Sequence, residues 1–240
     1  MESITREGPL PFSQPMIAAI LAGRKNKTRR IFKGKAIGEF ENICRVTNGL
    51  PKNQLNRWGA MFVDKSDPNH PVRHFTPSPY GGPGDMLYVK ETHFVYGGWT
   101  FSESIGGKTR WSFQADKNEP VFFCDNFPDV YEFETGISTK IGYYRRSSLF
   151  MFKDYARIWL KVTGLRVERL QDISEADARA EGYPGTDVDG KHIPWSPIGW
   201  FMSLWKSINN GRTGCKWDDN HWVWVVEFER VDRPKAAKDG

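Results

Sequence analysis

The sequence predicts an α+β fold in which a small, barrel-like sheet carries a few helices and two surface insertions. Strand-like segments outnumber helical ones, and the last of them, 221–228, is apolar on both faces and therefore central. Two irregular stretches, at about 34–80 and 97–147, interrupt the regular pattern. We expect a single domain over 1–231, with both stretches as insertions, followed by a solvated tail over 232–240.

Composition is typical of a water-soluble chain. The mean hydropathy is −0.58, and no window approaches the roughly 18 apolar residues of a membrane span. The first residues lack the apolar core of a signal peptide. The three cysteines, Cys44, Cys124 and Cys215, are far apart and lack CxxC spacing, which favours reduced thiols over a disulfide framework or a zinc site. We therefore expect a cytoplasmic protein with no membrane partner.

The first helix is predicted by its cap and its apolar spacing. Ser13 is a good N-cap, and apolar residues recur at helical intervals from Met16 to Leu21. Gly23 suits the position just after the helix C-terminus. The remaining elements follow in order: strands at 58–63 and 86–92, a hairpin of 111–115 with 121–123, a helix over 172–182, a helix opened by Ser196 and Pro197, and the strand at 221–228. Between the hairpin and the helix over 172–182, segments 156–162 and 165–170 form either one long, bent strand or two strands broken at Gly164.

A dense group of basic residues follows the first helix. Between Gly23 and Lys35 the chain has seven basic residues and no acidic one: Arg24, Lys25, Lys27, Arg29, Arg30, Lys33 and Lys35. With a net charge of +5, this segment points to an anionic partner, a nucleic acid or nucleotide first. A solvated charged face is the alternative. Thr28 lies among these cations, so its hydroxyl could act on a substrate with a lysine of lowered pKa as base.

Two glutamates are candidates for the same site. Glu181 is predicted in the last turn of its helix, where the helix dipole disfavours a carboxylate, although surface glutamates near helix ends are common. Glu91 ends a strongly apolar strand, and alternation turns it inward on the side of Leu87 and Val89. A buried carboxylate needs a cationic partner, which the basic segment could supply.

Metal and nucleotide motifs are lacking in the sequence. His70 and His74 are four residues apart, but Pro68 and Pro71 prevent the helix that would make them joint ligands. The chain has no GxxxxGK[ST], no GxGxxG after a strand and no GxSxG. We expect neither a metal nor a cofactor.

In combination, four segments resemble the ASCH superfamily, a branch of the PUA-like fold. The layout is similar to the larger ASCH-type proteins of bacteriophages and prophages, and the common core covers a little over half the chain. The matching segments are 20–30 (ILAGRKNKTRR), 83–92 (PGDMLYVKET), 170–182 (LQDISEADARAEG) and 222–228 (WVWVVEF).

The resemblance implies a small β-barrel that binds RNA, nucleotides or modified bases. Small bacterial members are amidohydrolases that deacetylate N4-acetylcytidine with a lysine, a threonine and a glutamate. Motif by motif, these fall on Lys25, Thr28 and Glu181. The small enzymes lack both insertions, and segment 148–157 lacks the Pro and Trp that phage relatives carry there. The candidate binding residues around the site are Arg24, Lys27, Arg29, Arg30 and Glu91.

Three functional hypotheses follow. The first is a metal-independent amidohydrolase that removes an acyl group from the exocyclic amine of cytidine or a related base. The second is a non-catalytic RNA- or DNA-binding module, with RNA preferred, in which Lys25, Arg29 and Arg30 hold phosphates and aromatic residues of the insertions stack on bases. The third is a phage accessory protein that binds a host factor. If the chain is phage-encoded, it would act in the bacterial cytoplasm; the oligomeric state stays open.

Overall fold

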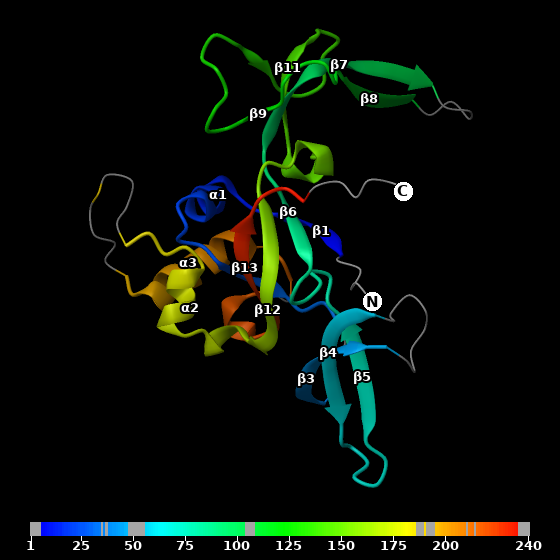
Figure 1. Ribbon diagram of the computed structural model, residues 1–240, viewed down its shortest axis with the longest axis vertical. Coiled ribbons are helices and arrows are strands. Elements are labelled where there is room, and N and C mark those ends of the chain that lie inside the picture. Colours follow the sequence, from blue (N-terminus) through cyan, green and yellow to red (C-terminus); the bar gives the residue numbers. More distant parts are fainter. Residues whose placement is uncertain are drawn as a thin grey trace. The chain divides into compact units, whose positions relative to one another are not determined.

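The central sheet is assembled from strands that are far apart in the sequence. In the computed structural model its order is β1 (Glu7–Pro11), β6 (Met86–Lys90), β12 (Trp159–Arg169), β13 (Trp222–Val231), β2 (Lys27–Ile31). The structure describes residues 6–34, 36, 38–47, 56–103, 109–185, 190, 195–209, 211–213 and 215–234. Strands make up 42% of the residues that the structure describes and helices are few, so the fold is α+β with a sheet-rich core (Figure 1).

Strands β12 and β13 lie side by side as the longest antiparallel pair of the sheet (Figure 1). Val223, Val225 and Val226 of β13 are completely buried, which confirms that this strand is central. Of the two alternatives for 156–170, the single long, bent strand is confirmed: it is β12, with a register shift between Val162 and Gly164. A bulge at this position lets the strand bend without ending.

The sheet does not close into a barrel within the part of the chain that the structure describes. Strands β1 and β2 are its two ends, and the sheet order places no pair between them. Strand β1 contains Pro9 and Pro11, and proline has no N–H for a further ladder, so it suits an edge strand. The structure therefore confirms the predicted sheet-rich α+β core, but it shows no closed barrel among the described residues.

The stretch expected to be irregular, at 34–80, forms a second antiparallel sheet. Its strands are β3 (Glu39–Val46), β4 (Arg57–Asp64) and β5 (Val72–Pro77), with β4 in the centre. The strand predicted at 58–63 is thus confirmed, whereas its two neighbours were missed. Phe62 of β4 is fully buried and contacts the rings of Phe32, Phe40 and Trp222, which joins this sheet to the central one.

Three α-helices are present among the described residues: α1 (Gln14–Leu21), α2 (Glu175–Ala180) and α3 (Pro197–Asn209). Ser174 caps α2 by accepting a hydrogen bond from the backbone N–H of Asp177. Four short 3-10 helices accompany them: η1 (Ser148–Phe150), η2 (Lys153–Tyr155), η3 (Leu170–Asp172) and η4 (Trp217–Asp219). None of the described helices has the length and apolar character needed to cross a membrane.

The chain divides into two compact units. The first contains 1–9, 18–88 and 158–240, and the second contains 10–17 and 89–157. The expected tail at 232–240 lies outside the described residues from 235 onward. The second unit holds a further sheet, with the strands β7 (His93–Glu103), β8 (Thr109–Ala115), β9 (Phe122–Phe123), β10 (Phe133–Glu134) and β11 (Gly142–Arg146).

The sheet of the second unit corrects the expected hairpin. Segment 111–115 belongs to β8, but it pairs with β7, and β9 also pairs with β7 at its other end. Aromatic side chains of this sheet's strands and of the loop between β9 and β10 pack against one another. Tyr143 contacts Tyr96, Phe122, Phe127 and Tyr131 through ring packing. These aromatic contacts form a core of the second unit that is separate from the central sheet.

Candidate functional site

The chain between α1 and β2 brings Lys25 beside Glu181. Gly23 has φ +70° and ends the helix as expected. The backbone N–H groups of Arg24 and Lys25 both donate to the carbonyl of Ala19, which turns the chain back. Lys25 and Glu181 then form an antiparallel bridge, although they are 156 positions apart. Two of the three predicted catalytic residues are therefore neighbours.

Lys25 makes three hydrogen bonds through its Nζ. The acceptors are Glu181 Oε2 at 2.6 Å, the Glu181 carbonyl at 2.8 Å and the Lys27 carbonyl at 2.8 Å. An ammonium group has three N–H donors, which matches these three acceptors. The exposed fraction is 0% for the Lys25 side chain and 2% for that of Glu181. The pair is thus removed from bulk water and held in one geometry.

Burial has the largest effect on the pKa of Lys25. Removal from water lowers its pKa below the usual 10.5, and the nearby Glu181 carboxylate opposes this. Arg30 and Arg29 lower the pKa further through charge repulsion. The net direction is downward, so the neutral amine is more accessible here than in an ordinary lysine. A neutral amine can accept a proton, which an exposed lysine does poorly near neutral pH.

Glu181 is held from both sides by cations. Lys25 contacts Oε2, and Arg29 Nη1 donates to Oε1 at 3.3 Å. Glu181 is the C-cap of α2, where the helix dipole disfavours a carboxylate, and the two cations offset that disadvantage. The carboxylate is therefore fixed in position and compensated in charge.

The next residue, Gly182, sets the approach of α2 to Lys25. Its φ is +107°, and a Cβ built there would meet the Ala19 Cβ at 3.0 Å and the Lys25 Cβ at 3.4 Å. We expect Gly182→Ala to reduce the free energy of unfolding by about 1–3 kcal/mol, because the backbone conformation strains any side chain and Ala19 must move. Urea unfolding measures the loss.

Gly142→Ala is the matched control for this prediction, since Gly142 has open space around it and no positive φ. It should change the free energy of unfolding by no more than about 0.5 kcal/mol. Equal stability of the Gly182→Ala variant and the natural chain would contradict the close packing described for this site.

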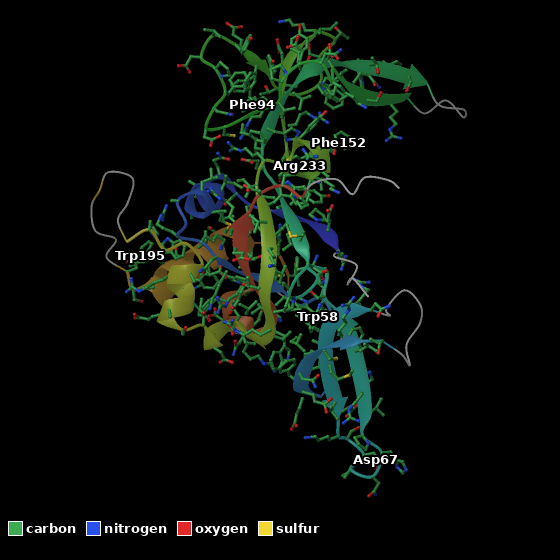
Figure 2. The ribbon with its side chains drawn as sticks, viewed as in Figure 1. Trp58, Asp67, Phe94, Phe152, Trp195 and Arg233 are labelled. Atoms are coloured by element: carbon green, nitrogen blue, oxygen red, sulfur yellow. The ribbon has the colours of Figure 1, made fainter. Side chains whose placement is uncertain are left out.

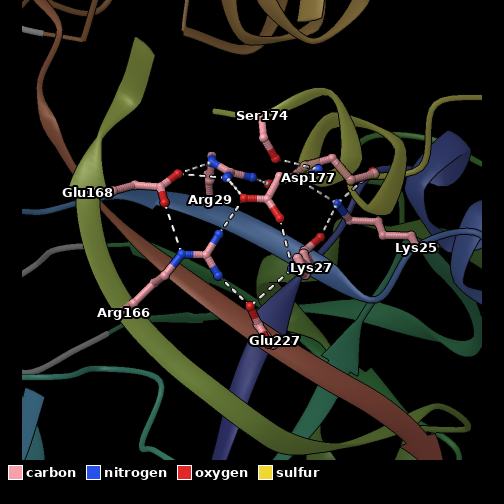
Figure 3. A network of polar contacts seen from close by, with 9 residues as sticks. Lys25, Lys27, Arg29, Arg166, Glu168, Ser174, Asp177 and Glu227 are labelled. Atoms are coloured by element: carbon pink, nitrogen blue, oxygen red, sulfur yellow. Dashed lines mark hydrogen bonds and ion pairs between the residues drawn. The ribbon is translucent and has the colours of Figure 1, made fainter. Parts of the chain in front are cut away.

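Lys25 and Glu181 belong to a larger network of four cations and four carboxylates (Figure 3). Asp177 is its centre: it accepts from Lys27 Nζ at 2.8 Å, from Arg29 Nη2 at 2.7 Å and from Arg166. The members are Lys25, Lys27, Arg29 and Arg166 with Glu168, Asp177, Glu181 and Glu227. The formal charges of the network cancel.

This network corrects the expectation of an unpaired cationic loop. The residues from Lys27 to Ile31 form strand β2, and three of the predicted basic residues, Lys25, Lys27 and Arg29, are paired with acids. The acids were missed because they come from β12, α2 and β13, far away in the sequence. Asp177 and Glu181 are one helical turn apart, a spacing that places them on the same side and could have suggested their shared partner.

Thr28 and Arg30 lie on the other face of β2. Strand alternation turns them away from Lys27 and Arg29. Thr28 is buried, and its hydroxyl has no hydrogen-bond partner among the residues the structure describes. Charge repulsion from both Arg29 and Arg30 lowers the pKa of Lys25. Arg24 remains exposed and donates to the carbonyl of Gly182 at 3.4 Å.

Glu91 has a different partner from the one expected. It is fully buried, as predicted, but its two carboxylate oxygens accept from Arg157 Nε and Nη2, each at 2.9 Å. Arg157 also donates to Asp125 at 2.8 Å. All three residues belong to the second unit, whereas the basic segment belongs to the first. A guanidinium matches a carboxylate with two parallel hydrogen bonds, which explains why an arginine holds this position.

Within the described ranges, no group of three or more His, Cys, Asp and Glu side chains is arranged to hold a metal ion. Cys44, Cys124 and Cys215 are free thiols. In comparisons with protein-family models, with curated proteins and with solved structures, nothing matches this chain.

Proposed function

We propose that this protein is a metal-independent amidohydrolase that removes an acyl group from the exocyclic amine of cytidine or a related base, on a PUA-like version of the α+β core. The observation that carries the proposal is the buried contact of Lys25 with Glu181, in which the pKa of the lysine is lowered. A lysine of this kind is a suitable general base. The ASCH resemblance of the surrounding motifs adds the substrate class.

The contact between Lys25 and Glu181 suggests the roles of these two residues, and the ASCH resemblance suggests that of Thr28. Neutral Lys25 takes a proton from the Thr28 hydroxyl or from a water molecule, and the resulting nucleophile attacks the amide carbon. As the C–N bond breaks, Lys25 returns the proton to the leaving amine. If Thr28 attacks, water then hydrolyses the acyl-threonine ester, so the overall reaction consumes one water. Glu181 touches Lys25 and holds it in place, which makes it a positioning residue.

The charge balance of the network supports an uncharged reacting group at this site. To hold phosphates there, Lys25 and Arg29 would have to leave their carboxylates. Breaking a buried pair costs about 3–5 kcal/mol, because the remaining charge stays buried. The amide of an acylated base carries no charge and requires no such exchange. The site thus suits the hydrolase hypothesis better than phosphate binding by the same residues.

The experiment is incubation of the purified protein with N4-acetylcytidine and chromatography of the products. We expect release of cytidine and acetate by the natural chain and by the control variant Lys33→Ala, because Lys33 is exposed and outside the network. The Lys25→Ala variant should release neither. Circular dichroism checks that the variants remain folded. An inert natural chain would exclude this activity on the free nucleoside.

A further inference from the structure

The second unit has a cleft beside strands β7, β8 and β11 of its sheet. Register places Trp99 opposite Phe113 and His93 opposite Arg146, and opposite residues of an antiparallel pair share one face. The cleft has a volume of about 1170 Å³. Segment 149–155, which contains the turn between η1 and η2, lines it together with β7, β8 and β11. All of its lining residues belong to the second unit.

Large aromatic side chains in this cleft are exposed to water. The exposed fraction is 38% for Trp111, 56% for Phe150 and 65% for Phe152. Phe152, labelled in Figure 2, lies between η1 and η2. Exposed aromatic residues that gather in one place mark a binding surface more often than a solvated one. Flat rings at the mouth of a cleft suit a ligand that is itself flat.

The same cleft is positively charged. Its lining contains Lys90, Arg110, Lys117 and Arg146, against the single acid Asp154. His93 also lines it, but burial lowers its pKa to about 4, so this ring is neutral near pH 7. The charge of the cleft therefore comes from lysine and arginine and stays constant between about pH 6 and 8.

Arg146 has an unusual environment for a guanidinium. Its Cζ lies 4.8 Å from the Trp99 ring centroid, 4.5 Å from that of Phe113 and 4.9 Å from that of Phe150. No described carboxylate forms an ion pair with it. Trp99 Nε1 is buried and has no hydrogen-bond acceptor in the described part of the chain. An unused donor of this kind is costly unless a ligand supplies the acceptor.

We propose that this cleft binds single-stranded nucleic acid. Bases stack on Trp111, Phe150 and Phe152, and the phosphates between them lie against Arg110 and Lys117. Aromatic rings interleaved with cations are the arrangement that binds single strands without sequence selection. A duplex hides its base faces and can use only the cations. This inference goes beyond the hydrolase proposal and rests on residues that take no part in it.

The test is fluorescence anisotropy with a labelled oligouridylate of about 12 nucleotides, within the usual site size. The natural full-length chain should bind it, with an affinity that falls as salt rises from about 50 to 200 mM; two phosphate contacts give a log–log slope of about −1.4. The double variant Trp111→Ala, Phe150→Ala should bind at least about 10-fold more weakly. The variant Arg110→Gln, Lys117→Gln should flatten the salt slope.

Trp195→Ala is the matched control, since Trp195 is an exposed tryptophan outside the second unit. It should bind as the natural chain does. The proposal is overturned if the natural chain fails to bind at low salt, if the Trp111, Phe150 double variant binds equally well, or if a duplex of the same length binds as tightly. Hydrolysis of free N4-acetylcytidine should be unchanged in the double variant. Loss of oligonucleotide binding and loss of hydrolysis are therefore separate results, and each proposal can fail without the other.

Discussion

Replacement of Lys25 by arginine should lower the hydrolysis rate of N4-acetylcytidine by about 10²–10⁴-fold, the usual contribution of a general base. Arginine keeps the positive charge that Glu181 needs, so the buried pair is preserved. It cannot become neutral in a protein, because a guanidinium keeps its proton at every pH at which the chain is folded. Single-turnover kinetics measure the loss, and an unchanged urea unfolding curve shows that it does not come from misfolding.

The pH dependence of the natural chain gives a second readout for the same prediction. Burial lowers the pKa of Lys25 below 10.5, and only the neutral amine accepts a proton. The rate should therefore be lowest in acid, rise as the pH passes through the pKa of Lys25, and level off before pH 10.5. Lys33→Ala should keep this profile. A profile that is flat over the whole range would show that no group of this kind is the base.

Replacement of Arg157 by alanine should reduce the free energy of unfolding by about 3–5 kcal/mol, because it leaves the Glu91 carboxylate buried without a cation. The pKa of Arg157 is raised: its contacts with Glu91 and Asp125 outweigh the effect of burial. It therefore stays charged throughout the working range. Urea unfolding of the full chain, followed by tryptophan fluorescence, measures the loss.

A surface ion pair of the same unit is the control for that prediction. Lys140 contacts Glu134 at 3.4 Å and is mostly exposed, so Lys140→Ala should cost less than about 1 kcal/mol. The double variant Arg157→Met, Glu91→Leu removes both charges and should recover part of the stability lost in Arg157→Ala. Equal losses in Arg157→Ala and Lys140→Ala would show that the Glu91 pair is not a buried one.

Local signals predicted several elements because those signals act over short distances. The cap at Ser174 and the glycine at 182 bracket α2, and an apolar run predicts β13 as a central strand. The same reasoning missed β3 and β5. Their sequences alternate weakly, and β3 has an irregularity between Phe40 and Asn42, so pairing with β4 rather than local pattern makes them strands.

The sequence alone placed Lys25 and Thr28 just after the first helix, Glu181 at the end of α2, and Glu91 on the inner side of its strand. These placements depend on helix caps and on side-chain alternation, which are local. Only the tertiary structure decided which charges meet. Lys25 binds Glu181 across 156 positions, and Glu91 binds Arg157 rather than the basic segment. Ion pairing depends on distance in space, and the topology of the sheets sets that distance.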